Sequence, residues 1–289
     1  MTTTSIISDF KEITKIRLSV SVVFSSIAGY LIGVQTVDIL TLILLVLGGY
    51  FMVGASNAFN QIIEKDLDAL MDRTKNRPIP AGRMSVNTAF IIASLFTVLG
   101  IVILYIINPK TAMYGAISIF LYTCAYTPLK TKTPLAVFVG AIPGAIPFML
   151  GWVAARNDFG IEPGTLFAIQ FLWQFPHFWS IGWFLHEDYK KAGFMMLPTG
   201  KQDKGTAVQI IIYTIWTVLA SLIPVLGFTG DLSLSIVGAI IVLALGLFML
   251  YFALELFKKR TEKSAKQLML ASVSYITLLQ VVYIIDKFI

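Results

Sequence analysis

The stretch NQIIEKDLDALMDRTKNRPIPAGR, from Asn60 to Arg83, decides how the chain can fold, because it sets charged side chains between two long apolar segments. Within it, Asn60, Glu64 and Asp68 follow one another at intervals of four residues. Residues four apart lie on one face of an α-helix, so these side chains are predicted to form one acidic stripe. Such a stripe suits Mg²⁺, which takes one or two carboxylates together with the oxygens of a bound phosphate.

Basic side chains follow the acidic stripe directly. Arg73, Lys75 and Arg77 are candidates for contact with phosphate oxygens, Arg as a planar fork and Lys as a point charge. Pro78 and Pro80 then end the helix. Basic residues alone are typical of a solvated loop that sets membrane topology, but carboxylates that continue the face of a membrane helix are costly and indicate a function.

The composition identifies a membrane protein. The chain has 289 residues, of which 57% are hydrophobic and 13% charged, and a mean hydropathy of +0.80; these values exclude an ordinary soluble domain. The net charge of +6 lies in short loops between apolar segments, which favours membrane topology over binding of nucleic acid. Cys124 is the only cysteine, so the chain has no disulfide framework and no cysteine metal site.

Apolar segments of roughly 20 residues, the length that crosses a bilayer, recur nine times. The sequence therefore predicts an all-α polytopic protein with nine transmembrane helices, in a single domain that covers 1–289. A charged loop follows both the second and the sixth segment, which suggests an internal duplication of a four-helix unit. The predicted spans are 16–34, 39–62, 86–107, 111–129, 134–155, 164–185, 206–228, 232–256 and 267–286.

The basic residues are distributed unequally between the two sides of these spans. Nineteen of the 22 Lys and Arg fall in the N-terminal segment and in the loops after spans two, four, six and eight. Because cytoplasmic loops carry the excess of Lys and Arg, the N-terminus is predicted in the cytoplasm and the C-terminus on the opposite side of the cell (inner) membrane. Lys15 and Arg17, before and at the start of span one, are interpreted as interfacial anchors.

The chemistry-bearing loops are predicted to share the cytoplasmic side. The loop YTPLKTKTP after span four contains Tyr126 and Lys130, and HEDYKKAGFMMLPTGKQDKG, from His186 to Gly205, follows span six. Loops on the other side are short and carry nothing comparable. This one-sided chemistry favours a central cavity that opens to the cytoplasm over a channel, which needs polar features at both ends.

At this point the residues resemble a known family. Asn60, Gln61, Glu64 and Asp68 follow the NDxxDxxxD motif of the UbiA-type intramembrane prenyltransferases, except that Gln61 and Glu64 stand where that motif has Asp. The runs ITKIR, MDRTKNRPIPAGRMS, YTPLKTKTP and FPHFWSIGWFLHEDYKKAGFMMLP look like the heme-modifying branch of that family, over about residues 13–205. Of the second DxxxD motif, only Asp188 is present, after Glu187.

The resemblance implies nine helices and transfer of a farnesyl group from farnesyl diphosphate to a vinyl group of heme B, with water addition that gives heme O. It implies that Asn60, Glu64, Asp68 and Asp188 hold Mg²⁺ and act in catalysis. Arg73, Lys75, Arg77 and Lys130 are then expected to contact diphosphate, while the rings of Tyr126 and Trp179 stabilise a carbocation.

His177 follows Pro176 in span six and has two interpretations of equal weight. It is either a packing residue or, eleven residues before Asp188 on nearly the same helix face, a contact to the porphyrin. Two other functions stay open. One is a UbiA-type enzyme that acts on an aromatic or quinone precursor, and the other is a secondary transporter of an anionic substrate. The expected partners are membrane lipid and heme-handling or terminal-oxidase assembly proteins.

Overall fold

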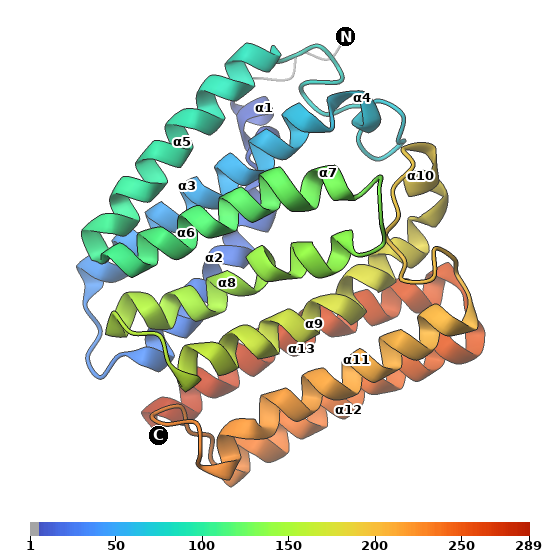
Figure 1. Cartoon of the computed structure of the whole chain (residues 1–289). Coiled ribbons are helices and arrows are strands. Elements are labelled where there is room, and N and C mark those ends of the chain that lie inside the picture. Colours follow the sequence, from blue (N-terminus) through green and yellow to red (C-terminus); the bar gives the residue numbers. More distant parts are fainter. Residues whose placement is uncertain (1–5) are drawn as a thin grey trace.

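The computed structural model describes residues 6–289, and residues 1–5, which include the N-terminus predicted to be cytoplasmic, lie outside the described part. Every element in the described part is helical (Figure 1). The elements are α1 (Ile6–Ile13), α2 (Ile16–Gly33), α3 (Ile39–Ile63), α4 (Lys65–Asp68), α5 (Val86–Ile107), α6 (Pro109–Phe120), the π-helix η1 (Leu121–Tyr126), α7 (Thr127–Leu129), α8 (Ala136–Arg156), α9 (Ile161–Phe184), α10 (His186–Lys191), α11 (Lys204–Leu222), the 3₁₀-helix η2 (Ile223–Leu226), α12 (Ile236–Lys259) and α13 (Glu262–Phe288).

Seven helical segments in the described part are long and apolar enough to cross a membrane, which confirms an integral membrane protein of the all-α class. They comprise α2, α3, α5, α8, α11 with η2, α12 and α13. The predicted spans 111–129 and 164–185 coincide with two further helical segments. The first is divided because α6 changes into η1, and the second is α9, whose amides and His177 lower its hydropathy.

Two hydrophobic cores meet along α2 and α8. One core gathers α2, α3, α5, α6 and α8, and the other gathers α9, α11, α12 and α13 with parts of α2 and α8. A Cβ on Gly29 would overlap Phe148 O, and one on Gly151 would overlap Ser26 O. These glycines therefore let the backbones of α2 and α8 touch, in agreement with the close packing that small residues give to membrane helices.

The acidic stripe does not lie on one continuous helix. α3 ends at Ile63, Glu64 occupies its C-cap, and the short α4 then runs to Asp68. The prediction that Pro78 and Pro80 end the helix was therefore wrong, because helix stops at Asp68 and turns follow before α5. One helical turn still joins the two residues, because Asp68 N donates to Glu64 O at 2.7 Å. Both side chains therefore remain on the buried side.

The loops that carry the charged motifs meet at one end of the bundle, at the upper right of Figure 1, where α4, α7 and α10 come together. Asp188 of α10 accepts a hydrogen bond from Asp72 N at 2.8 Å. Met195 N donates to Lys130 O at 2.7 Å, which joins the loop after α10 to the loop after α7. The C-terminal end of the chain lies at the opposite end of the helices.

Candidate active site

A cavity of about 780 Å³ lies inside the bundle, between α2, α3, α8, α9 and α13. Its walls are mainly apolar, and charged side chains gather where α3, α4 and α7 end. The charged and amide side chains at that end are Lys15, Arg17, Asn57, Asn60, Glu64, Asp68, Arg73, Arg77 and Lys130, so Arg17, predicted as an interfacial anchor, also lines the cavity. The structure thus brings three of the predicted metal ligands and three of the four predicted phosphate contacts into one site.

Asp68 is fully buried at this end of the cavity. Arg77 Nη1 lies 2.6 Å from Asp68 Oδ2, and Thr74 Oγ1 donates to the backbone oxygen of Asp68 at 2.8 Å. Asp68 Oδ1 has no hydrogen-bond partner in the described part of the chain. A buried carboxylate oxygen without a donor is costly, so this atom is suited to a cation.

Glu64 forms the second ion pair of the site. Lys130 Nζ lies 2.8 Å from Glu64 Oε1, and both side chains are nearly buried. Lys130 also lies over the rings of Tyr126, at 4.6 Å, and Phe194, at 5.4 Å. These contacts fix a positive charge beside the carboxylate, with both side chains largely removed from solvent.

Asn60 links α3 to the residue before α2 and to α7. Asn60 Nδ2 donates to Thr127 Oγ1 at 3.3 Å, and Lys15 Nζ donates to Asn60 Oδ1 at 3.4 Å. Lys15 therefore belongs to the site rather than to the membrane interface. Its removal from water, followed by the charges of Arg77 and Lys130, lowers the pKa of Lys15 well below its usual value.

The backbone around Lys15 is held in place by α3. Lys15 adopts a left-handed conformation with φ 45° between α1 and α2. Gln61 Nε2 of α3 donates to the two backbone oxygens that shortly precede Lys15, Glu12 O at 3.2 Å and Ile13 O at 2.9 Å. Gln61 thus anchors the bend that directs Lys15 into the cavity.

The donor set fits Mg²⁺. Glu64 and Asp68 supply carboxylates and Asn60 an amide oxygen, and this set leaves further positions for the oxygens of a diphosphate. Among residues 6–289, no group of three or more His, Cys, Asp or Glu side chains could hold a metal ion. The set is therefore complete only when a phosphate shares the ion, as is usual for Mg²⁺.

Asp188 and Lys75, two other predicted site residues, lie outside the cavity lining. Asp188 accepts hydrogen bonds from the backbone N–H groups of Asp72, at 2.8 Å, and Arg73, at 3.3 Å. Lys75 pairs with Asp72 at 2.6 Å, and hydrogen bonds from Lys191 and Lys75 lower the pKa of Asp72 to about 2. Asp188 thus fixes the loop that carries Arg73, whose guanidinium lines the cavity over Tyr189.

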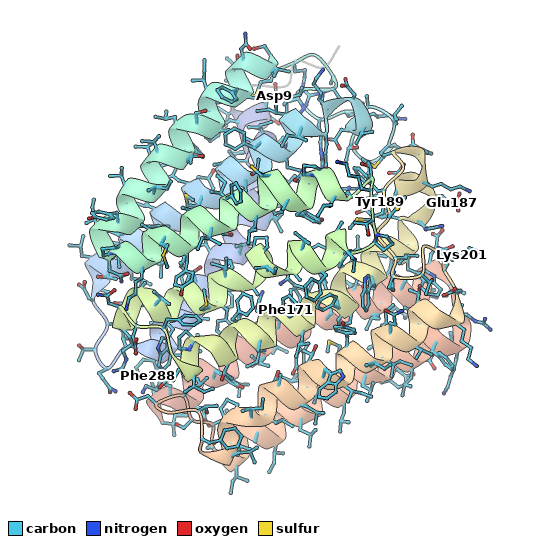
Figure 2. All side chains as sticks on the ribbon, in the orientation of Figure 1. Asp9, Phe171, Glu187, Tyr189, Lys201 and Phe288 are labelled. Carbon is cyan, nitrogen blue, oxygen red and sulfur yellow. The ribbon has the colours of Figure 1, made fainter. Side chains whose placement is uncertain are left out.

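Tyr189 itself lines the cavity from α10. In Figure 2 it lies toward the loop after α7, while Glu187 of the same helix lies at the outer edge of the molecule. Glu187 is exposed. The side of α10 that faces the site is therefore the side of Tyr189.

His177 lines the cavity from α9. Its Nδ1 lies 2.9 Å from Ser272 Oγ, and its ring stacks on Trp173 with centroids 4.6 Å apart. Trp179, also predicted to contact substrate, instead lies buried in the core against Phe175 and Tyr213. The two residues are two apart on α9, so they point to different faces.

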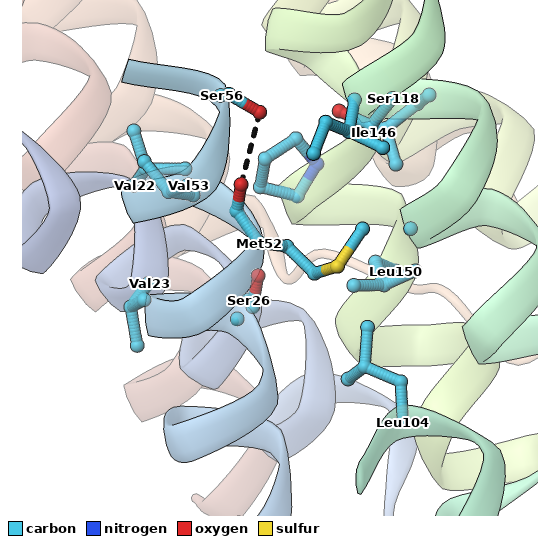
Figure 3. Close-up of a pocket in the computed structure, with 14 residues that line it drawn as sticks. Val22, Val23, Ser26, Met52, Val53, Ser56, Leu104, Ser118, Ile146 and Leu150 are labelled. Carbon is cyan, nitrogen blue, oxygen red and sulfur yellow. Dashed lines mark hydrogen bonds between the residues drawn. The ribbon is translucent and has the colours of Figure 1, made fainter. Parts of the chain in front are cut away.

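A smaller apolar pocket of about 40 Å³ adjoins the main cavity (Figure 3). Both are lined by Val22, Val53, Ser56, Ser118 and Pro147. Met52 and Leu104 line the far side of the smaller pocket, where Met52 extends across it. The main cavity therefore has an apolar extension between α2, α3, α6 and α8.

Several lining residues were not predicted from the sequence. Tyr122 lines the cavity together with Tyr126. Both lie on the π-helix η1, a type of helix that often marks functional sites. Gln170 and Gln174 of α9 also line the cavity. A buried amide inside a predicted span was the signal that could have identified them.

The sequence matches the model of the UbiA prenyltransferase family over residues 22–277. It is 73% identical over 285 residues to a protoheme IX farnesyltransferase of Christiangramia forsetii, covering 99% of this chain and 95% of the relative. It is 70% identical to a protoheme IX farnesyltransferase of Flavobacterium psychrophilum, covering 98% and 96% of the two chains.

A solved structure of the same fold is that of a UbiA homologue from Archaeoglobus fulgidus bound to DMAPP and Mg²⁺. It has a TM-score of 0.76 and 15% identity, over 97% of this chain and 98% of that one. The family match over most of the sequence, the full-length relatives and the shared helical fold establish that the chain belongs to the UbiA prenyltransferase family.

Proposed function

We propose that the protein transfers the farnesyl group of farnesyl diphosphate to a vinyl group of heme B, with addition of water, and forms heme O and diphosphate. The observation that carries this proposal is the buried cluster of Glu64, Asp68, Arg77 and Lys130 at one end of a largely apolar cavity. The relatives named protoheme IX farnesyltransferase support the identity of both substrates.

The positive side chains of the cluster bind and stabilise the leaving diphosphate. Breaking the allylic C–O bond builds negative charge on its oxygens, and preorganised positive charge lowers the barrier most where water is excluded. Lys15, Arg77 and Lys130 surround this end of the cavity, and Arg73 enters from the loop that Asp188 holds. Because Glu64 and Asp68 partly neutralise two of these cations, the site is stable before substrate binds.

Asn60, Glu64 and Asp68 are proposed to hold Mg²⁺ together with the diphosphate. The ion, when bound, supplies charge neutralisation of the diphosphate and so weakens the bond to the allylic carbon. The Mg²⁺ and prenyl diphosphate bound to the Archaeoglobus fulgidus homologue support this use of the site. We assign Asp188 to positioning of the 72–73 backbone, because its carboxylate is already occupied by two N–H groups and Lys191.

His177 is proposed to bind the heme iron. Ser272 Oγ occupies Nδ1, which leaves Nε2 as the ring nitrogen available to an axial bond, and an oriented imidazole is a common heme ligand. The ring of Tyr126, which lies under Lys130 Nζ, is proposed to face the carbocation. The centroid of the Tyr122 ring lies 5.2 Å from that of Tyr126. Trp179 has no such role, since its ring packs in the core.

The farnesyl tail is proposed to run along α3 toward the smaller pocket. From Asn60 to Met52 are eight residues, which span about 12 Å of helix. A farnesyl main chain is about 14 Å long when extended, from carbon–carbon bonds of about 1.5 Å at angles of about 111°. A tail anchored by its diphosphate at Asn60 therefore ends near Met52 (Figure 3).

The site is proposed to open on the cytoplasmic side of the cell membrane. The excess of Lys and Arg in the loops at this end supports that orientation, with the C-terminus on the other side. We further propose that α6–η1–α7 and α9 complete a set of nine spans, since both are of spanning length and pack between the neighbouring spans. Heme-handling or terminal-oxidase assembly proteins remain the proposed partners.

Incubation of the purified protein with heme B, farnesyl diphosphate and Mg²⁺ tests the proposal. The expected product is heavier than heme B by one farnesyl group and one hydroxyl group, as measured by mass spectrometry. A matched reaction with an aromatic acid in place of heme B should give no product. Prenylation of the aromatic acid, with heme B left unmodified, would instead identify the quinone-precursor enzyme.

A further inference from the structure

Four polar side chains line the cavity at membrane depth and have no part in the mechanism above. Gln170 and Gln174 lie on α9, Ser25 on α2 and Gln280 on α13, and all four are buried. Polar groups at this depth are costly unless each finds a hydrogen-bond partner. Their hydrogen bonds therefore show which of their polar atoms face the cavity without a partner among the described residues.

The amide of Gln174 is oriented by two carbonyl oxygens. Its Nε2 donates to Ala141 O at 2.9 Å and to Gln170 O at 3.3 Å. Carbonyl oxygens accept only, so the nitrogen must face them and Oε1 must face away. Among the described residues, no group donates to Gln174 Oε1, which is left as an open acceptor on the cavity wall.

In the amide of Gln170 the oxygen is the atom that has a partner, and the nitrogen is the open one. Its Oε1 accepts from Gln280 Nε2 at 3.3 Å, and the same nitrogen of Gln280 donates to Ser25 Oγ at 3.0 Å. Gln170 Nε2 has no acceptor within residues 6–289. Gln170 and Gln174 are one turn apart on α9 and both line the cavity, so neighbouring turns offer it one open donor and one open acceptor.

Two glycines of α8 relate Gln174 to Tyr126. On α8, a Cβ at Gly140 would overlap the ring of Tyr126, and a Cβ at Gly144 would overlap Gln174 Oε1. Gly140 and Gly144 are one turn apart, about 6 Å along the helix. Gln174 is therefore about one turn deeper than Tyr126, whose ring contacts Lys130 of the diphosphate end.

We propose that Gln170 and Gln174 hold the water molecule whose oxygen becomes the hydroxyl group of the product. The water accepts from Gln170 Nε2 and donates to Gln174 Oε1, which gives it two of the two to four partners that a buried water needs. Its second lone pair then points into the cavity. This inference rests on the proposed function and assigns a positioning role within it.

The covalent steps balance with this water as the only further reactant. The allylic C–O bond breaks with its electron pair on diphosphate, and the vinyl π electrons form the new C–C bond to the farnesyl C1. The cation then lies on the vinyl carbon attached to the porphyrin. The water oxygen forms a bond to that carbon, and the released diphosphate takes the proton. Without the water, the neighbouring carbon loses a proton and an alkene forms.

The test measures how the product divides between hydroxyl and alkene. Gln174→Met and Gln170→Met keep the volume of the side chain and remove the open polar atoms, so the alkene product, lighter by one water, should rise at least about tenfold relative to the hydroxylated one. Gly144→Ala should produce the same change, because the new Cβ displaces Gln174 Oε1 while the amide remains. In H₂¹⁸O the wild-type hydroxyl should carry the label.

Gln202→Leu is the matched control, since Gln202 donates to Trp183 O and lies outside the cavity lining. It should leave the product ratio unchanged. An unchanged ratio in Gln174→Met and Gln170→Met, at any turnover, overturns the proposal, because loss of packing alone lowers both products equally. Failure of the proposed function is distinct: the wild-type protein would then form no farnesylated heme of either kind.

Discussion

Arg77 Nη1 lies 2.6 Å from Asp68 Oδ2, while Asp68 Oδ1 has no hydrogen-bond partner among the described residues. One carboxylate thus serves two purposes. One oxygen compensates a nearly buried guanidinium, and the other is left for a cation that arrives with the diphosphate. The same residue is therefore needed both for the fold of the 65–84 segment and for the proposed chemistry.

Asp68→Ala should abolish heme O formation and lower the free energy of unfolding by about 3 kcal/mol, because Arg77 is then buried without a counter-charge. The double variant Asp68→Ala/Arg77→Ala should recover part of that stability without recovering activity. Thermal unfolding in detergent and product analysis measure the two effects. Full activity in Asp68→Ala would remove Asp68 from the metal site, and the exposed Asp66→Ala serves as control.

Lys15 should make diphosphate binding depend on pH. Its pKa is lowered in the free protein by burial and by the charges of Arg77 and Lys130, and a bound diphosphate raises it again. Binding then takes up a proton, so the affinity falls by up to about tenfold per pH unit as the pH rises between the two pKa values. Titration calorimetry of diphosphate at several pH values measures this slope.

Lys15→Arg is the control for that experiment, because a guanidinium stays protonated throughout. Its binding should lose the part of the pH dependence due to residue 15 and keep the part due to diphosphate itself. An identical slope in both proteins would exclude Lys15 as the titrating group.

Asp188→Ala should raise the KM for farnesyl diphosphate about tenfold, because two charge-assisted hydrogen bonds to the loop of Arg73 are lost. The Mg²⁺ concentration for half-maximal activity should stay unchanged. Glu187→Ala, at an exposed neighbouring position, should alter neither value. A marked rise in the Mg²⁺ requirement would show instead that Asp188 is a metal ligand.

Met52→Ala should enlarge the end of the tail pocket and admit a prenyl chain one isoprene unit longer. We expect kcat/KM for geranylgeranyl diphosphate to rise about tenfold relative to farnesyl diphosphate, the size of effect that apolar pockets give. Met249→Ala, a buried methionine on α12 outside both pockets, is the matched control. Equal selectivity in the two variants would place the tail elsewhere.

His177→Ala should abolish the shift of the heme Soret band that binding to the protein produces. Ser272→Ala should keep the shift and weaken heme binding by about tenfold, because Ser272 only orients the imidazole. Absorption spectra during heme titration measure both. An unchanged spectrum in His177→Ala would favour the packing interpretation of this residue.

The sequence by itself determined the class of the protein and the shared face of Asn60, Glu64 and Asp68. Apolar segments of spanning length have no other stable form than membrane helices. Asn60, Glu64 and Asp68 could be identified because their four-residue spacing is a local property that helix geometry converts directly into a shared face. Their common burial follows from that spacing even though α3 ends at Ile63.

The tertiary structure alone decided which charges meet. Lys130 lies 66 residues from Glu64 in the sequence and Asp188 lies 116 residues from Asp72, and both contacts depend on how the helices pack. No periodicity encodes the left-handed turn that directs Lys15 inward or the change from α6 to the π-helix η1. Local spacing fixes the face of a helix, but the partner of that face is chosen by long-range packing.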